Sequence, residues 1–348
     1  MRIVVNDIAA STGGAMTVLR DFYNCVCEHD RENQWIFLLG DRYFEETENV
    51  KIIPMPQIKK SGIRKLVFDH LTGRRFINDL KPDLVLSMQN IITFGVKAPQ
   101  AVYIHQSIPF QSVKNFSFLK AVERKAAVIQ HIIGRIIKRS VKKSNLVIAQ
   151  TQWIKDAICR KCGIAPQKIK VVTPSVRVKM GTADLFDQNN FFYPTSDQFY
   201  KNNTCLMEAS ALLQQEGVAH QVVMTLPSEK SSGTIQCIGR IPYEQVLEHY
   251  NRSTLVFPSY IETFGYPLAE ARQLGTIVLA SDCPFSREVL AGYENAYFFD
   301  PFQPVQLKEL MKQVALGQII KKPVAATVET APDSWLTVMQ TVCGMRKS

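Results

Sequence analysis

The stretch Val256–Gly292 reads VFPSYIETFGYPLAEARQLGTIVLASDCPFSREVLAG and combines a strand, a loop with two glutamates and a helix. The apolar run Leu255–Phe257 predicts a short buried strand. Pro267 suits the first turn of a helix and Gly275 is a good terminator, so we predict a helix over Pro267–Leu274. A buried strand followed by a loop and a helix is the repeating unit of a parallel sheet covered by helices.

The same unit recurs along the 348 residues in two series of short apolar strands. The first series comprises Arg2–Asn6, Trp35–Leu39, Val50–Ile53, Leu84–Ser87, Val102–His105 and Leu146–Ala149. The second comprises Phe191–Tyr193, Gln221–Thr225, Ile235–Ile238, Leu255–Phe257, Ile277–Ala280 and Tyr297–Phe299. A chain of this length favours two domains. The sequence therefore predicts an α/β protein with two Rossmann-like domains facing each other across a cleft.

The domain boundaries follow from these two series. We place the first domain over residues 1–178, a polar linker without periodicity over 179–190, and the second domain over 191–325. Residues 326–348 form a tail in which Ser334–Met345 is a predicted helix. The pattern leaves open whether that helix packs back on the first domain.

The charge of the chain points to an anionic partner. The net charge is +10 and the pI is about 9.1, which favours nucleic acid, anionic lipid headgroups or phosphorylated small molecules. The chain lacks basic residues interleaved with aromatic ones and any known nucleic-acid module. We therefore expect no nucleic-acid partner.

The cysteines and the N-terminus predict a cytoplasmic protein. Of the eight cysteines, Cys159 and Cys162 alone have redox or metal spacing, and no second pair or nearby histidine completes a zinc site. The first apolar run becomes polar at Asn6 and Asp7, unlike a signal peptide. No run approaches the ~20 apolar residues of a membrane-spanning helix. We expect reduced thiols and no bound metal.

Polar residues and glycines follow several predicted strands, where an open parallel sheet binds its ligands. They are Gly13 and Gly14 after the first strand, His105 after Val102–Ile104, Lys201 and Asn202 after Phe191–Tyr193, and Glu262 and Glu270 after Leu255–Phe257. The amides of Phe264, Gly265 and Tyr266 precede a positive helix end and suit a phosphate or sugar oxygen. Together these groups predict a site for an anion and a sugar. Taken alone, Lys201 is equally a solvated loop charge and His105 a buried structural histidine.

The stretch Val256–Gly292 closely resembles the signature of glycosyltransferase family 4, whose Glu-(seven residues)-Glu motif is matched by Glu262 and Glu270. Residues 238–259, IGRIPYEQVLEHYNRSTLVFPS, are similar to the family segment that leads into this signature. In the first domain the resemblance is looser. The other matching segments are FYPTSDQFYKNN at 192–203, which in the family supplies a phosphate-binding lysine, the Gly13–Gly14 turn, YIHQSIPF at 103–110 and SNLVIAQTQWIKDAI at 144–158.

This resemblance implies the GT-B fold and a metal-independent transfer that retains the anomeric configuration, with a nucleotide-diphosphate sugar as donor. It implies that Glu270 binds the donor ribose and that Glu262 contacts the donor sugar or its phosphate oxygens. Lys201 is implied to neutralise the departing diphosphate, where charge develops in the transition state. The amides of Gly13 and Gly14 are implied to approach the diphosphate and the sugar.

The resemblance also assigns His105 to a sugar hydroxyl, and it has one departure. Family members often carry an arginine a few residues before the lysine. Here residues 194–196 are Pro-Thr-Ser. Lys201 then carries more of the leaving-group charge, or Arg240 assists it.

The segment Phe116–Ser144 is predicted as one basic amphipathic helix. Its apolar residues are Leu119, Val122, Ala126, Ile129, Ile133, Ile136 and Ile137, and its basic residues are Lys120, Arg124, Lys125, Arg135, Lys138, Arg139, Lys142 and Lys143. Such a helix lies on an anionic bilayer, or it packs its apolar face on a domain core. Both interpretations stay open. Contact with the inner face of the cell membrane suits an acceptor carried on a lipid.

The leading hypothesis is an enzyme that transfers a hexosyl group to a lipid-linked glycan acceptor during assembly of a surface polysaccharide, such as capsule or O-antigen. One alternative is a catalytically silent GT-B protein that binds nucleotide-sugars. Another is a basic protein that binds a membrane surface or nucleic acid without turnover. The sequence leaves open the nucleotide, the sugar, the acceptor, the linkage and the oligomeric state.

Overall fold

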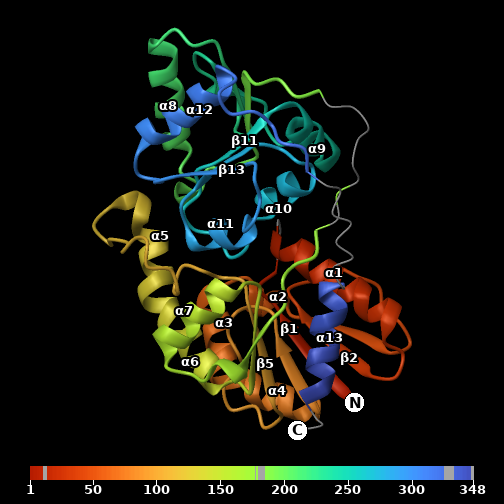
Figure 1. Ribbon diagram of the computed structural model, residues 1–348. Helices are drawn as coiled ribbons and strands as arrows, with labels where there is room; N and C mark the ends of the chain where they lie inside the picture. The colour runs from red at the N-terminus through yellow and green to blue at the C-terminus, as the bar shows by residue number, and fades with distance from the viewer. Residues whose placement is uncertain (11–13, 177, 179–184, 325–332, 346–348) are drawn as a thin grey trace. The chain divides into compact units, whose positions relative to one another are not determined.

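The computed structural model describes residues 1–10, 14–176, 178, 185–324 and 333–345. These residues fall into two compact units (Figure 1). Unit 1 is Met1–Ser175 together with Ala331–Ser348, and unit 2 is Val176–Thr330. Residues 179–184 of the predicted linker lie outside the described residues, and 185–190 lead into the first strand of unit 2.

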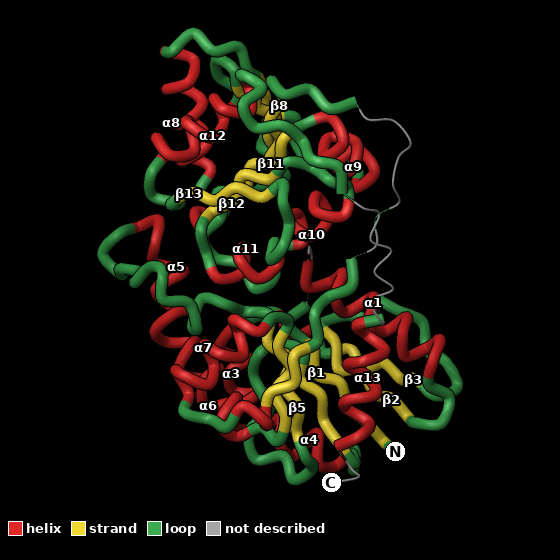
Figure 2. Tube along the Cα trace, in the orientation of Figure 1, coloured by secondary structure: helices red, strands yellow, loops and turns green. Residues whose placement is uncertain are grey.

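The described part of unit 1 holds a parallel sheet of seven strands in the order β3-β2-β1-β4-β5-β6-β7 (Figure 2). The structure confirms the six predicted strands to within two residues and adds β7, which is too short to give a pattern. The order reverses between β1 and β4, which makes this the switch point of the sheet. The strands are β1 (Arg2–Asp7), β2 (Gln34–Leu39), β3 (Val50–Pro54), β4 (Leu84–Ser87), β5 (Gln100–Ile104), β6 (Leu146–Ala149) and β7 (Ile169–Val171).

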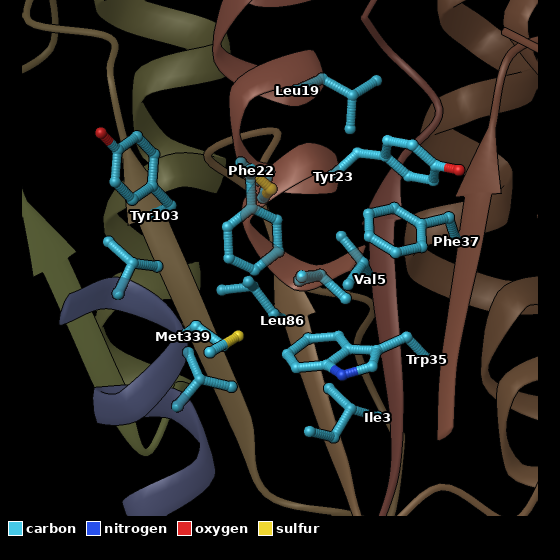
Figure 3. Close-up of a cluster of buried hydrophobic side chains, with 14 of the residues drawn as sticks. Ile3, Val5, Leu19, Phe22, Tyr23, Trp35, Phe37, Leu86, Tyr103 and Met339 are labelled. Carbon is cyan, nitrogen blue, oxygen red and sulfur yellow. The ribbon is translucent and has the colours of Figure 1, made fainter. Parts of the chain in front are cut away.

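One core of unit 1 lies between the sheet, helix α1 (Gly14–His29) and the tail helix α13 (Ser334–Gly344). Figure 3 shows Phe22 of α1 and Met339 of α13 reaching the same cluster as Trp35 of β2. The rings of Phe22 and Trp35 meet edge to face with centroids 5.8 Å apart. Full burial of an apolar side chain of this size contributes about 1.5–3 kcal/mol. The tail helix is therefore part of unit 1.

The segment predicted as one helix over 116–144 is helical only from Ala121 and is interrupted. It runs through η2 (Ala121–Glu123), α5 (Arg124–Ala127), the π-helical turn η3 (Val128–Ile133) and α6 (Gly134–Lys143). A π turn holds an extra residue, which rotates the following side chains by about 100°. Leu119 and Val122 are 91% and 75% exposed, whereas Ile137 is buried in the core. The prediction of a single continuous apolar face is therefore wrong.

The remaining helices of unit 1 cover the sheet and connect its strands. The segment between β3 and β4 also contains a π turn, η1, which places Asp69 in the protein interior. These elements are α2 (Pro56–Lys59), α3 (Gly62–Val67), η1 (Phe68–Thr72), α4 (Gly73–Asp79), α7 (Gln152–Cys162) and η4 (Pro166–Lys168).

The described part of unit 2 holds a parallel sheet of six strands in the order β10-β9-β8-β11-β12-β13. The structure confirms all six predicted strands, and the order reverses between β8 and β11. The strands are β8 (Asn190–Tyr193), β9 (Gln221–Met224), β10 (Ile235–Cys237), β11 (Thr254–Phe257), β12 (Val278–Ser281) and β13 (Ala296–Phe299).

Helices pack on this second sheet through aromatic and aliphatic side chains. Phe257 of β11, for example, meets Phe285 of α11 edge to face at 6.2 Å between centroids. The helices are η5 (Phe199–Lys201), α8 (Asn203–Gln215), η6 (Ser228–Lys230), α9 (Tyr243–Arg252), α10 (Tyr266–Gln273), α11 (Pro284–Val289) and α12 (Pro304–Ala315). Across the described ranges, no helix has the length and apolar character needed to cross a membrane.

Candidate functional site

The switch point of unit 2 brings together two of the predicted site residues. The strands β8 and β11 are neighbours and parallel, so the loops that follow them leave the sheet at the same edge. The first loop carries Lys201 and the second carries Glu262, and Lys201 Nζ lies 2.6 Å from Glu262 Oε1. Ser259 Oγ donates to the same carboxylate oxygen at 2.8 Å. Both charged side chains remain partly exposed.

The backbone around Lys201 is held by its neighbours on both sides. Asn202 adopts a left-handed conformation with φ 57°, which asparagine tolerates better than most residues. Its side-chain amide donates to the carbonyl oxygens of Pro258 at 3.2 Å and Pro301 at 2.7 Å. Tyr193 Oη donates to the Lys201 carbonyl at 2.8 Å. These contacts fix the backbone at Lys201 and do not involve its ammonium group.

Two phenols beside the ion pair are kept neutral by their surroundings. Burial, and after it the Glu262 carboxylate, raises the pKa of Tyr200 to about 12. Burial also raises the pKa of Tyr193 well above its usual value. Neither hydroxyl ionises near neutral pH, so the local charges are those of Lys201 and Glu262.

Glu270 lies in a different environment from Glu262. The predicted helix start at Pro267 places Glu270 in the opening turn of the helix. In the structure it is instead the fifth residue of α10, which corrects that placement. The side chain is 8% exposed, and its two oxygens accept hydrogen bonds from Tyr243 Oη at 3.1 Å and Tyr250 Oη at 3.0 Å. Burial raises the pKa of Glu270, and the hydrogen bonds from Tyr250 and Tyr243 act against that rise.

The loop between the two glutamates turns sharply at Gly265. This residue caps α10 with φ 93°, a left-handed conformation that favours glycine. Phe264 before it is buried and Tyr266 after it is partly exposed, with ring centroids 5.3 Å apart. Helix α10 begins at Tyr266, one residue before the predicted start.

Arg240, the predicted helper of Lys201, lies on an exposed loop after β10. The loop is anchored by Gly239, whose N–H donates to the Leu226 carbonyl at 2.8 Å. Within the described residues, no hydrogen bond or ion pair joins Arg240 to Lys201 or Glu262. The structure therefore does not bring Arg240 into contact with the ion pair.

The remaining predicted site residues belong to unit 1. Gly13 lies outside the described residues, and Gly14 is the first residue of α1. His105 follows β5 directly, and its Nε2 lies 2.9 Å from Asn90 Nδ2. Asn90 Oδ1 also accepts from the backbone N–H groups of His105 at 2.8 Å and Gln106 at 3.0 Å. Because Asn90 Nδ2 is a donor, His105 Nε2 is the acceptor and the ring proton sits on Nδ1.

The His105 ring is neutral at physiological pH. Removal of the ring from water lowers the pKa of His105 to about 4, and the nearby Lys65 charge acts in the same direction. A neutral imidazole held by an amide is suited to hydrogen-bonding a hydroxyl group rather than to pairing with an anion.

A group of buried polar residues at the switch point of unit 1 was not found by sequence reasoning. Asp7 ends β1 and Asp69 reaches the same edge from η1; burial raises the pKa of each carboxyl to about 7. Gln89 Nε2 donates to Asp69 Oδ1 at 3.1 Å, and Asn6 Nδ2 donates to Thr93 Oγ1 at 3.1 Å. Asn6 and Asp7 could have been found, because Asn6 ends a predicted strand and Asp7 follows it directly; Asp69 gives no such signal.

In unit 2 the sequence reasoning missed Tyr243, Tyr250 and Ser259. Tyr243 and Tyr250 are seven residues apart on α9, directly before β11. Their helical spacing places them on one face, a signal that could have found them. Among the described residues, no three histidine, cysteine, aspartate or glutamate side chains gather as a candidate metal site.

Two family descriptions match the chain. "Glycosyltransferase Family 4" matches residues 12–179, and "Glycosyl transferases group 1" matches residues 228–329. Among curated proteins, the O-antigen chain mannosyltransferase RfbU of Salmonella typhimurium is 23% identical over 228 residues. That match covers 62% of this chain and 60% of the length of RfbU.

Solved structures of low sequence identity share the fold over nearly the whole chain. WaaG, a glycosyltransferase involved in lipopolysaccharide biosynthesis, matches with a TM-score of 0.69 at 12% identity, covering 98% of this chain and 100% of WaaG. HepE of Anabaena, in complex with UDP-glucose, matches with a TM-score of 0.65 at 14% identity, covering 100% of this chain and 99% of HepE. These likenesses establish the GT-B fold of two Rossmann-like domains.

Proposed function

Because the chain belongs to the glycosyltransferases of the family 4 type, we propose that it transfers a hexosyl group from a nucleotide-diphosphate sugar to a lipid-linked glycan, with retention of configuration. The observation that carries the proposal is the Lys201–Glu262 pair at the switch point of unit 2. The glycan belongs to a surface polysaccharide, in keeping with the O-antigen and lipopolysaccharide enzymes among the relatives.

Lys201 has the position and charge for a leaving diphosphate. In the free protein its ammonium is neutralised by Glu262 at 2.6 Å. A diphosphate that enters the switch point offers more negative charge than one carboxylate, so Lys201 exchanges Glu262 for phosphate oxygens. The lysine then stabilises the charge that develops as the sugar departs. A lysine in this role makes a metal-independent reaction our expectation.

The exchange leaves Glu262 free to act on the sugar. Its carboxylate keeps the hydrogen bond from Ser259 Oγ, so it stays at the mouth of the site while its second oxygen accepts from a sugar hydroxyl. In unit 1, the neutral His105 ring suits a second sugar hydroxyl. The complex of HepE with UDP-glucose supports a nucleotide-diphosphate sugar as the class of donor.

A nucleotide-binding screen followed by a turnover assay tests this function. The purified chain is first heated with UDP, GDP, ADP and their sugars, and the ligand that raises the Tm most identifies the donor. That donor is then incubated with a lipid-linked acceptor, and the product's anomeric configuration is read by NMR. Nucleotide binding without any product favours the catalytically silent alternative. If none of the nucleotides changes the Tm, the proposal is contradicted.

We further propose that unit 1 rests on the anionic inner face of the cell membrane through the segment 118–125. Leu119, Val122 and Phe118 are exposed apolar side chains, and Arg124 and Lys125 add positive charge beside them. Exposed apolar groups next to basic ones are typical of membrane-surface contacts. This surface replaces the continuous helical face expected over 116–144.

The segment 118–125 is held in shape by a buried carboxylate. Glu123 accepts from the Ser117 N–H at 3.0 Å and pairs with Lys114 Nζ at 3.1 Å. Arg124 Nε donates to the Phe118 carbonyl at 3.2 Å. The apolar side chains are therefore presented on an ordered turn rather than on a loose loop.

Vesicle sedimentation tests the membrane contact. The double change Leu119→Ser with Val122→Ser is expected to lower binding to phosphatidylglycerol vesicles by about tenfold, since both side chains lose their apolar burial. Ile320→Ser is the control, because Ile320 is an isoleucine of unit 2 that is 72% exposed, close to the 75% of Val122. Equal binding of the double variant and the control would remove this surface from the proposal.

A further inference from the structure

Both carboxylate oxygens of Glu270 are held by tyrosines from one helix. Tyr243 Oη donates to Oε1 at 3.1 Å, and Tyr250 Oη donates to Oε2 at 3.0 Å. The two tyrosines are seven residues apart on α9, which is two turns, so they project from the same face. Helix α9 thus fixes the plane of the Glu270 carboxylate in the absence of any ligand.

The two oxygens differ in their access to solvent. Tyr250, which holds Oε2, is 1% exposed, and its own backbone carbonyl accepts from Thr276 Oγ1 at 2.8 Å. Tyr243, which holds Oε1, is 46% exposed at the first position of α9. Oε2 therefore lies on the buried side of the carboxylate, and Oε1 lies toward the half-exposed phenol.

The hydrogen-bonding capacity of the carboxylate leaves room for two more donors. An ionised carboxylate has about four lone-pair sites, two on each oxygen. The two phenols fill one site on each oxygen. One site per oxygen remains, which matches the pair of O–H donors of a ribose 2′,3′-diol.

We propose that Tyr243 is a positioning residue through which Glu270 recognises the ribose diol and selects ribonucleoside over deoxyribonucleoside diphosphates. This inference rests on the proposed function, since it requires that the nucleotide-sugar binds in unit 2. One ribose hydroxyl shares Oε1 with Tyr243, and the other shares Oε2 with Tyr250. Loss of the Tyr243 hydroxyl therefore affects recognition of one hydroxyl and spares the other.

The charge state of Glu270 gives the inference a second consequence. Burial raises the pKa of Glu270, and the Tyr243 hydrogen bond is one of two contacts that oppose this rise. Removal of that hydroxyl raises the pKa further. A protonated carboxyl loses part of its acceptor capacity, so nucleotide affinity in the variant declines at a higher pH than in the wild type.

Charged groups on α10 itself and on the elements packed against it also affect this titration. The strands β11 and β12 carry no charged residue. On α11, Arg287 is paired with Asp282 at 2.7 Å. The other titratable groups on the neighbouring elements are Glu288 of α11, Arg272 of α10, and Glu244, Glu248, His249 and Arg252 of α9.

The experiment compares Tyr243→Phe with the control Tyr297→Phe and with Glu270→Gln. Tyr297 is a partly exposed tyrosine on β13 of the same unit, whereas the hydrogen bonds to the Glu270 carboxylate come from Tyr243 and Tyr250. Calorimetry measures the affinities of UDP and GDP and of their 2′-deoxy and 3′-deoxy counterparts between pH 5 and pH 8. The Tm of each variant is recorded beside its affinity.

We expect Tyr243→Phe to weaken binding of the ribonucleotide by about tenfold, the effect of one hydrogen bond to a charged group. The penalty for removing one ribose hydroxyl shrinks in this variant, and the penalty for removing the other is unchanged. The acid-side loss of affinity moves to higher pH. Tyr297→Phe behaves as the wild type in all three respects.

The three variants separate failure of this inference from failure of the proposed function. If Glu270→Gln binds ribonucleotides and deoxyribonucleotides as the wild type does, Glu270 has no ribose role and the inference is overturned while the proposed function stands. If the wild type itself binds none of these nucleotides, the proposed function is overturned. If Glu270→Gln weakens binding but Tyr243→Phe keeps the wild-type discrimination and pH profile, the inference on Tyr243 alone is overturned. A lower Tm of Tyr243→Phe with unchanged discrimination shows a structural role and overturns it as well.

Discussion

The switch points of the two sheets share one topology and differ in charge. In unit 2 the loops after β8 and β11 carry an ionised, partly exposed pair, Lys201 and Glu262, at 2.6 Å. In unit 1 the corresponding neighbours are β1, which ends in the buried Asp7, and β4, which is followed by the buried Gln89. Burial raises the pKa of Asp7 to about 7, so its carboxyl is largely neutral below that pH.

This difference teaches that the fold provides the place for a ligand and the residues after the strands select its chemistry. An exposed lysine whose partner can be exchanged suits a diphosphate. An edge of neutral acids, amides and an uncharged histidine suits hydroxyl groups, which both donate and accept hydrogen bonds. This difference supports our proposal that unit 2 binds the charged end of the donor and that unit 1 binds carbohydrate.

The largest expected effect comes from removing the Lys201 charge at the switch point of unit 2. Lys201→Ala is expected to lower kcat by about 10²- to 10³-fold, the effect of losing one group that stabilises transition-state charge. Donor affinity falls less, since the interaction strengthens as the diphosphate departs. Steady-state kinetics and calorimetry measure the two quantities. Lys312→Ala is the control, because Lys312 is also paired with a carboxylate, Glu216 at 2.7 Å. Normal turnover in Lys201→Ala would place the leaving-group charge elsewhere.

A second prediction concerns Asp69, one of the buried acidic residues at the switch point of unit 1. Burial raises the pKa of Asp69 from 3.8 to about 7, so its contribution to stability is present below pH 3.8 and is lost as the pH rises through 7. Asp69→Asn keeps the uncharged form at every pH. We expect the variant to match the wild type near pH 4 and to exceed its stability by about 2 kcal/mol at pH 8, because a three-unit shift corresponds to at most ~4 kcal/mol.

Thermal unfolding between pH 4 and pH 9 measures this difference, with Asp282→Asn of unit 2 as the opposite case. The Arg287 guanidinium lowers the pKa of Asp282, so its stabilising contribution is present above the unfolded pKa and is lost on acidification. Both variants should therefore approach the wild type on acidification and deviate from it at high pH, where Asp69→Asn gains stability and Asp282→Asn loses it. A parallel pH dependence in Asp69→Asn and the wild type contradicts the assignment of a neutral edge.

The smallest expected effect tests whether Glu262 competes with a diphosphate for Lys201. Glu262→Gln removes the carboxylate that occupies Lys201 in the free protein. A partly exposed pair of this kind is worth about 0.2–1 kcal/mol, so the affinity for a nucleoside diphosphate without sugar should rise by up to about fivefold. Turnover falls in the same variant, because the sugar loses its acceptor group. Calorimetry with UDP and GDP gives the sign, and weaker binding of both would show that Glu262 itself contacts the phosphates favourably.

The strands could be predicted because each is a short apolar run that lies between two faces of helices. The runs Leu84–Ser87 and Leu146–Ala149 match β4 and β6 at both ends. β7 was missed, since three residues with one exposed side chain give no pattern. The helix over 116–144 was wrong because a π turn breaks the 3.6-residue period on which the prediction rests.

The contact between Lys201 and Glu262 follows from sequence and topology together, because both residues lie in the segments that follow neighbouring parallel strands. The surroundings of Glu270 do not follow in this way. Its hydrogen-bond partners lie on another helix, Tyr250 at 3.0 Å being buried beside it. Asp69 reaches the switch point of unit 1 from a π turn, and a π turn has no periodic pattern in the sequence from which it could be predicted.

The sequence by itself determined the order of strands and helices, the family resemblance and the chemical types gathered after the strands, because these depend on local apolar patterning and on motifs within one segment. The tertiary structure alone decided which of these groups are charged. The ionisation of Glu270, Asp7 and His105 depends on burial and on partners brought in from distant segments. Desolvation and hydrogen bonding act through space, and their effect exists only once the chain has folded.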